Sequence, residues 1–190
     1  MARPSFILAS ASPRRLQLLK QIGYEPDQVI ASDLDETLLP KELPLEYVRR
    51  MSREKCATVS ARFPQAVVLA ADTVVCCGRR ILPKADDEKT ARDCLRILQG
   101  RRHRVYTAVS VAYGNARRDI VAMTHVQFAR LTDHDISHYV ESGEWEGKAG
   151  GYAIQGKAEA FIPSINGSFS NVVGLPLAQT KRLLQAVLKE

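Results

Sequence analysis

Apolar residues gather in two kinds of pattern along the chain: short continuous runs, and longer stretches with helical spacing. The longest run, AVVLAADTVVCC at residues 66–77, is interrupted by a single carboxylate. A β-branched apolar run of this length is typical of a strand buried on both faces. Residues 5–9 form a shorter run of the same kind, and residues 29–31 indicate a further short strand. The pattern therefore predicts strands inside a covered sheet.

Helical spacing of apolar positions predicts five helices between and after these strands. They are expected over residues 13–22, 45–62, 87–98 and 132–142, and from Gly174-Leu175-Pro176 to Leu188. Thr132 has the side chain of an N-cap, and two aspartates follow it in the first turn of its helix.

Alternating residues predict a long antiparallel pair of strands over 104–113 and 119–130, with Gly114-Asn115 near the turn. Residues 150–170 are rich in glycine and hold short strand-like pieces. The fold class expected is α/β, with an elongated mixed sheet flanked by helices.

The composition is that of an ordinary globular protein. The 190 residues suit one domain, expected to span residues 1–190, and 45% of them are hydrophobic. No stretch approaches the roughly 18 apolar residues that span a bilayer, and the N-terminus lacks the pattern of a signal peptide. Four cysteines occur without a C-x-x-C pair, so we expect reduced thiols. These features predict a cytoplasmic protein without a membrane partner.

The charge points to an anionic partner. A net charge of +6 fits a nucleic acid, a membrane surface or a phosphorylated metabolite. The basic residues are dispersed and aromatic residues make up only 6%, which argues against a platform for nucleic-acid bases. Charge alone therefore leaves the class of anionic partner open, although nucleic acid is disfavoured.

The stretch LASASPRR at residues 8–15 has the chemistry of a phosphate site. A strand that ends in Ser10 and enters a helix through Pro13 exposes backbone N–H groups at the positive end of the helix dipole. Arg14 and Arg15 in the first turn oppose this dipole, which indicates that an anion binds there. The alternative is a plain serine cap with two solvated arginines.

Two carboxylates stand out. A buried carboxylate such as Asp72 needs a metal, a cation or a catalytic role, unless it lies in a loop between two strands. Glu36 lies in the acidic segment SDLDET, which is either solvated or close to Asp72. Together, the two side chains could hold Mg²⁺ or Mn²⁺, which prefer oxygen ligands and bridge phosphates. Lys55 and Lys84 carry no distinctive signal by themselves.

The segment GKAGGYAIQGK, residues 147–157, has four glycines that would let the backbone approach a ligand. Gln155 can both donate and accept hydrogen bonds and so could read the edge of a base. Neither a Walker A motif nor G-x-G-x-x-G is present. The four histidines form no ligand pattern, and we expect His134 and His138 at the surface.

Taken together, these pieces resemble the Maf family, the septum-formation-inhibitor-like nucleotide pyrophosphatases. The resemblance covers nearly the whole chain. It rests on Leu8-Ala9-Ser10-Ala11-Ser12-Pro13-Arg14-Arg15, Glu36, Glu54-Lys55, Ala71-Asp72-Thr73-Val74, Gly100-Arg101-Arg102-His103, Val105-Tyr106-Thr107, Lys148-Ala149-Gly150, Tyr152-Ala153-Ile154-Gln155-Gly156, Gly167-Ser168, Asn171-Val172-Val173 and Gly174-Leu175-Pro176.

The resemblance implies an elongated α/β fold, similar to that of inosine triphosphate pyrophosphatases, with two lobes and a central cleft. It implies a divalent metal, Mg²⁺ or Mn²⁺, and often a homodimer. The reaction implied is hydrolysis of a nucleoside triphosphate between the α and β phosphates. The family name also links such proteins to inhibition of septum formation.

The family's functional positions match Ser10, Arg14, Glu36, Lys55, Asp72 and Lys84, and its specificity positions match Arg14, Thr73 and Gln155. The resemblance implies that Ser10 and Arg14 bind the triphosphate, that Lys55 and Lys84 neutralise phosphate charge, and that Glu36 and Asp72 bind the metal. Asp72 is also the expected general base, and Thr73 and Gln155 the expected contacts to the base of the nucleotide.

The triplet Ile154-Gln155-Gly156 favours the branch that acts on dTTP and UTP over the branch that resembles 7-methyl-GTP pyrophosphatases. One departure stands out: Pro83-Lys84-Ala85 replaces the family's usual Gly-Lys-Pro. Pro83 fixes its own φ and restricts Leu82, which changes how Lys84 is presented.

Two alternatives remain at this stage. One is a regulator of cell division that binds nucleotide or nucleic acid without catalysis. The other is a pyrophosphatase with a different base specificity, such as inosine or xanthosine triphosphate, because the same phosphate site would serve it.

Overall fold

A computed structural model describes residues 3–188, and within it the chain divides into two compact units. The first unit comprises Met1–Asp72, Thr107–Ala122 and Gly174–Glu190. The second comprises Thr73–Tyr106 and Met123–Val173. Among residues 3–188, no helix is both long and apolar enough to cross a membrane.

A mixed sheet provides the framework. Its strand order is β2-β1-β3-β6-β7-β9, and β4 also pairs with β3. Strand β1 (Phe6–Ala9) is parallel to both β2 (Gln28–Val29) and β3 (Val67–Cys77). Strands β6 (Arg102–Tyr113) and β7 (Ala116–Gln127) form the long hairpin. The division between the units falls within β3, β6 and β7, so each of these strands contributes residues to both units.

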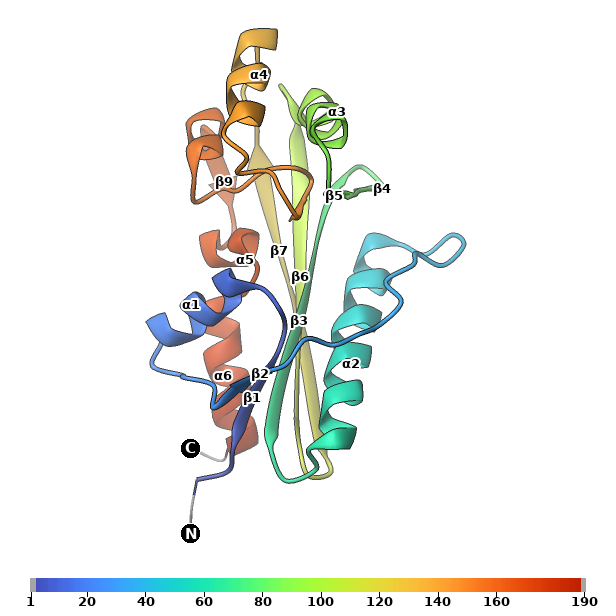
Figure 1. Cartoon of the computed structure of the whole chain (residues 1–190), viewed down its shortest axis with the longest axis vertical. Helices are drawn as coiled ribbons and strands as arrows, with labels where there is room; N and C mark the ends of the chain where they lie inside the picture. Colours follow the sequence, from blue (N-terminus) through green and yellow to red (C-terminus); the bar gives the residue numbers. More distant parts are fainter. Residues whose placement is uncertain (1–2, 189–190) are drawn as a thin grey trace. The chain divides into compact units, whose positions relative to one another are not determined.

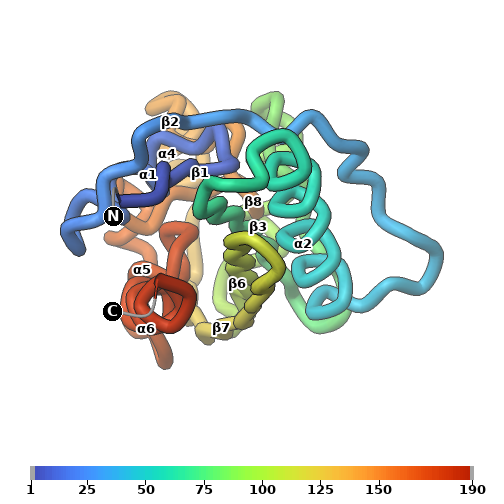
Figure 2. Tube along the Cα trace, turned by 90° about the horizontal axis from the view of Figure 1, so that it is seen from below, coloured from blue at the N-terminus to red at the C-terminus, as the bar shows by residue number. Residues whose placement is uncertain are grey.

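In the first unit, helix α2 (Pro44–Arg62) covers one face of the strands. Ile7 lies opposite Val68, and Ala9 lies opposite Ala70; these residues pack with Cys56 and Val59 of the helix. The alternate residues Leu8 and Leu69 are also fully buried, so both faces of β1 and β3 are covered as predicted. The unit also contains α1 (Pro13–Gln21) and α6 (Leu177–Leu188), and Figures 1 and 2 show α6 on the side of the strands away from α2.

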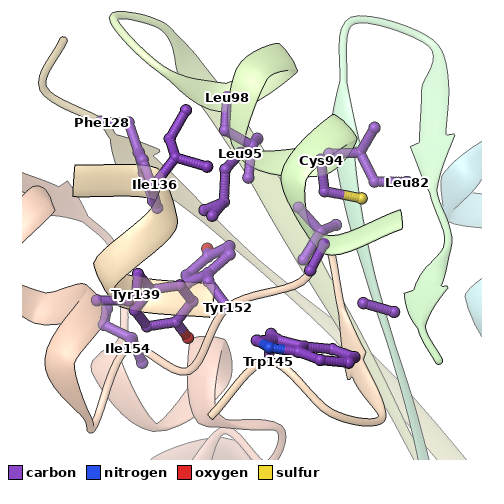
Figure 3. Packing of buried hydrophobic residues seen from close by; sticks show 14 of the residues in the cluster. Leu82, Cys94, Leu95, Leu98, Phe128, Ile136, Tyr139, Trp145, Tyr152 and Ile154 are labelled. Atoms are coloured by element: carbon purple, nitrogen blue, oxygen red, sulfur yellow. The ribbon is translucent and has the colours of Figure 1, made fainter. Parts of the chain in front are cut away.

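The second unit has its own apolar core, drawn in Figure 3. Helix α3 (Glu88–Leu98) contributes Leu95 and Leu98, and α4 (Asp133–Glu141) contributes Ile136 and Tyr139. Its other elements are β4 (Arg80–Leu82), β5 (Lys84–Ala85), β8 (Lys148–Ala149), the 3₁₀ helix η1 (Lys157–Phe161), β9 (Ser164–Asn166) and α5 (Phe169–Val173).

All five predicted helices are present, and Thr132 caps α4 in a capping box as expected. The second strand of the hairpin runs over 116–127 instead of 119–130, because the chain enters it directly after the turn, where Gly114 has φ 53°. Beyond it, Phe128 and Ala129 donate their N–H groups to Arg101 and Phe161. The sequence did not reveal β5 or α5, which are too short to show periodicity.

Candidate functional site

The phosphate-site candidate lies where β1 passes into α1 in the first unit. Ser10 is buried, and its Oγ accepts hydrogen bonds from the backbone N–H of Ser12, at 3.2 Å, and from Arg15 Nη1, at 3.0 Å. Ser12 is the N-cap residue, but its side chain makes no capping hydrogen bond, and Pro13 occupies the first turn as expected. A plain serine cap, the alternative for this stretch, is therefore wrong.

The contacts that Arg15 makes at this site were not predicted from the sequence. Its Nε donates to the carbonyl of Gly174 at 2.9 Å, while its Nη1 bonds Ser10. Burial lowers the pKa of Arg15, and the negative charges of Asp72 and Glu36 act in the opposite direction. The Arg14-Arg15 pair was conspicuous in the sequence, but the pattern did not reveal which of the two reaches Ser10. Arg14 is partly buried on the same turn, and its role as a phosphate ligand stays a prediction.

A buried lysine with two carboxylates forms the centre of the candidate site. Lys55 Nζ lies 2.7 Å from Asp72 Oδ1 and 2.7 Å from Glu36 Oε1. Lys55 is 6% exposed and Asp72 5% exposed. Charges this deeply buried are retained only when each has a partner. The structure thus brings together three of the predicted residues, and Asp72 lies within strand β3, not in a loop between two strands.

Local folding explains why the lysine is buried. Val48, Met51, Ser52, Lys55 and Val59 recur at helical spacing and are the buried face of α2. On that face, Ser52 Oγ bonds Ser110 Oγ at 3.0 Å, so its polar group is satisfied. Lys55 is satisfied in the same way by carboxylates from outside the helix. The strand run indicated that Asp72 needs a partner, whereas the helix pattern did not single out Lys55 as that partner.

The acidic segment between β2 and α2 presents Glu36 to this lysine. The Tyr47 hydroxyl donates to the carbonyl of Glu36 at 2.9 Å, and Arg50 Nη2 donates to the carbonyl of Thr37 at 3.1 Å. Burial, together with the negative charges of Asp72 and Glu36, raises the pKa of Tyr47 to about 12. The hydroxyl therefore remains protonated and can donate this hydrogen bond at neutral pH.

The two carboxylates suit a magnesium or manganese ion that is completed by other ligands. Both lie within hydrogen-bond distance of the same nitrogen, so they are close enough to share one cation. In the described part of the chain, no group of three or more His, Cys, Asp and Glu residues could hold a metal ion. Mg²⁺ is commonly held by one or two carboxylates plus water and substrate phosphates. The donor set fits an ion that binds together with a polyphosphate.

Lys84 belongs to the second unit. It begins β5, its residue is exposed, and it lies opposite Ala149 in the antiparallel pair with β8. The carbonyl of the preceding Pro83 accepts the N–H of Gly150 at 2.9 Å. The Pro83-Lys84-Ala85 departure is therefore accommodated in a regular strand pairing.

In the second unit, hydrogen bonds hold the chain on both sides of Gln155 in sequence. Tyr152 Oη lies 2.8 Å from Nε2 of the buried His103, and the N–H of Ala153 donates to the Tyr139 hydroxyl at 3.0 Å. The N–H of Lys157 donates to Glu144 Oε2 at 2.7 Å. Gln155 itself is exposed. The segment therefore presents an amide side chain from an anchored backbone.

Thr73 also belongs to the second unit and is partly buried within β3. Its role, like those of Lys84 and Gln155, stays a prediction from the resemblance. His134 and His138 are exposed on α4 with stacked rings, as expected for surface residues.

Comparisons with known proteins agree with the sequence resemblance. The family described as Maf-like protein matches residues 5–187. A dTTP/UTP pyrophosphatase of Zymomonas mobilis is 56% identical over 95% of this chain and 90% of its own. A dTTP/UTP pyrophosphatase of Novosphingobium aromaticivorans is 53% identical over 96% of this chain and 92% of its own.

Among solved structures, a HAM1 protein from Coxiella burnetii aligns with a TM-score of 0.49 and 14% identity, over 98% of this chain and 99% of that one. The family match, by contrast, spans nearly the whole chain, and the relatives named above exceed half identity. The chain therefore belongs to the family of Maf-like proteins.

Proposed function

We propose that this protein is a nucleoside triphosphate pyrophosphatase that hydrolyses dTTP and UTP to the monophosphate and pyrophosphate. The relatives named as dTTP/UTP pyrophosphatases support the substrate class. The observation that carries the chemistry is the buried Lys55 with Asp72 and Glu36 on the same nitrogen. Such a cluster offers both a base and a counter-charge for a polyphosphate.

In this proposal, water attacks the α phosphorus, and the bond from that phosphorus to the bridging oxygen breaks. Asp72 accepts the proton that the water loses, and pyrophosphate leaves with the bridging oxygen. Lys55 holds the Asp72 carboxylate in place and neutralises charge on the phosphate oxygens. A positioned base of this kind contributes about 10²–10⁴-fold to the rate.

Glu36 and Asp72 would hold the Mg²⁺ or Mn²⁺ ion. When bound, such an ion supplies charge neutralisation on the phosphates and lowers the pKa of bound water. Ser10 and the start of α1 bind the triphosphate, as anions bind at helix N-termini. Arg15 keeps Ser10 oriented, and Arg14 is assigned to the triphosphate from the family resemblance.

The remaining assignments also rest on the resemblance. Lys84 neutralises the leaving pyrophosphate, and Thr73 and Gln155 contact the base of the nucleotide. We place the activity in the cytoplasm and expect a homodimer that binds neither membrane nor nucleic acid. Gel filtration with light scattering tests the dimer.

The direct test is pyrophosphate release with Mg²⁺ or Mn²⁺ from dTTP, UTP, dCTP, dATP, dGTP, ITP and 7-methyl-GTP. We expect turnover to concentrate on dTTP and UTP. Activity centred on another base would retain the phosphate chemistry and overturn the roles of Thr73 and Gln155. No release from any of them by folded protein would favour the non-catalytic regulator.

The Asp72→Asn variant tests the mechanism. We expect turnover to fall by about 10²–10⁴-fold, because the amide cannot accept the proton. The fold should survive, since Lys55 retains Glu36 as a partner. Asp119→Asn is the matched control, because Asp119 is a carboxylate paired with Arg53 and has no part in the proposed chemistry. Near-normal turnover in Asp72→Asn would refute the assignment.

A further inference from the structure

Glu36 differs from its two partners in how it is supported. Lys55 comes from a helix and Asp72 from a strand, whereas Glu36 comes from the irregular segment of residues 30–43, between β2 and α2. The Glu36 side chain is 34% exposed, against 8% for Lys55 and 7% for Asp72. The position of Glu36 therefore depends on the contacts that hold residues 30–43 against helix α2. From here on, the acidic segment means all of residues 30–43, which include SDLDET.

Arg50 is the main attachment of the acidic segment to α2. Its Nε lies 2.7 Å from Glu42 Oε1 and its Nη2 lies 2.7 Å from Glu42 Oε2, in a two-bond pairing. The same Nη2 also donates to the carbonyl of Thr37. The Glu42 side chain is only 8% exposed, and this pairing raises the pKa of Arg50. Paired hydrogen bonds between charged groups are among the stronger polar contacts in proteins.

Tyr47 extends this attachment to Glu36 itself. It lies one helical turn before Arg50, and the Arg50 guanidinium lies 5.5 Å from the centre of its ring. Its hydroxyl bonds the backbone carbonyl of Glu36. Glu42 also contacts the backbone of the acidic segment, because its Oε2 accepts the N–H of Leu39 at 3.1 Å. The backbone carbonyls of Glu36 and Thr37 are thus held by the side chains of Tyr47 and Arg50.

We propose that Arg50, Glu42 and Tyr47 are positioning residues that keep the Glu36 carboxylate next to Lys55 and Asp72. The inference rests on the proposed function for its catalytic consequence, and on geometry alone for its structural one. A lysine would not replace Arg50, since it cannot form two parallel bonds to a carboxylate. The acidic segment is therefore part of the active-site framework, even though most of its residues are exposed.

The first experiment measures geometry and needs no activity. Amide hydrogen exchange of residues 33–43 is compared by mass spectrometry in the wild type, Arg50→Lys and Tyr47→Phe. We expect exchange to accelerate by about tenfold or more in Arg50→Lys, since hydrogen bonds to a charged group are lost. Arg53→Lys is the matched control, because Arg53 makes a similar two-bond pairing with Asp119 from the same helix. Unchanged exchange in both test variants would overturn the proposal.

The second experiment asks whether these residues act through Glu36. Pyrophosphate release at varied Mn²⁺ concentration is measured for Tyr47→Phe, Glu36→Gln and the double variant. We expect Tyr47→Phe to raise the Mn²⁺ concentration needed for half-maximal activity roughly tenfold, and to add less than about twofold when Glu36 is already glutamine. Fully additive effects would mean that Tyr47 does not act through Glu36. A wild type without activity would refute the proposed function, while the exchange data would still decide the positioning role.

Discussion

At the scale of single residues, burial determines which protonation state a side chain can hold. His103 is 1% exposed, packs against the rings of Phe128 and Tyr152, and bonds the Tyr152 hydroxyl. Burial lowers its pKa from 6.5 to about 4. The folded protein therefore keeps this histidine neutral at a pH where the unfolded chain would protonate it.

Stability should consequently fall between pH 6.5 and pH 4. In this range the unfolded chain binds a proton that the folded protein does not, so unfolding is favoured as the pH decreases. The shift in pKa corresponds to about 3 kcal/mol, of which about 2 kcal/mol should be lost by pH 5. Urea unfolding at pH 7 and pH 5 measures this. His103→Asn should flatten the dependence, and the exposed His138→Asn should retain it; equal slopes in all three proteins would contradict the prediction.

Residue chemistry was also the most predictable part of the candidate site. A carboxylate inside an apolar run needs a charged partner, and Asp72 has one in Lys55. The partner itself was not predictable from Asp72, because the strand pattern says nothing about which helix packs beside it. The contact of Arg15 with Gly174 and the bond between Tyr47 and Glu36 join residues far apart or in irregular segments, where no periodic pattern exists.

At the scale of elements, the long periodic segments were predicted, whereas several of the shortest elements, such as β5 and α5, were not. The helices α2 and α3 follow from apolar spacing, and β3 follows from its β-branched run. The pair β5 and β8 has two residues on each strand and is held by its surroundings. Gly150 shows how: it has φ +70°, and a Cβ placed there would lie 2.8 Å from Val75 Cγ1.

Gly150→Ala should therefore destabilise the protein more than the same change at Gly78. Gly78 has φ +63° but no heavy atom within 4 Å of an added Cβ, so its variant carries backbone strain alone, about 1–2 kcal/mol. Gly150→Ala adds steric overlap inside a packed region, which typically costs about 1–3 kcal/mol more. Denaturant unfolding of both variants measures the difference. Equal losses would show that the close approach to Val75 is relieved at no cost.

At the scale of the whole molecule, the two compact units share three strands. The division passes through β3, β6 and β7. Unfolding of either unit would therefore break hydrogen bonds in strands that continue into the other unit. We therefore predict that residues 1–190 unfold as one domain. Calorimetry should give a single transition whose calorimetric and van't Hoff enthalpies agree. Two resolved transitions would show independent units.

The hydrogen bond from Arg15 to Gly174 also has a consequence for biosynthesis. It joins positions separated by 159 residues, and the same arginine orients Ser10. A ribosome that has released the first strand and helix must still translate most of the messenger RNA before Gly174 emerges. Until then, Arg15 lacks the Gly174 carbonyl that holds it in place beside Ser10. The nascent polypeptide is thus expected to acquire nucleotide affinity only near the end of translation.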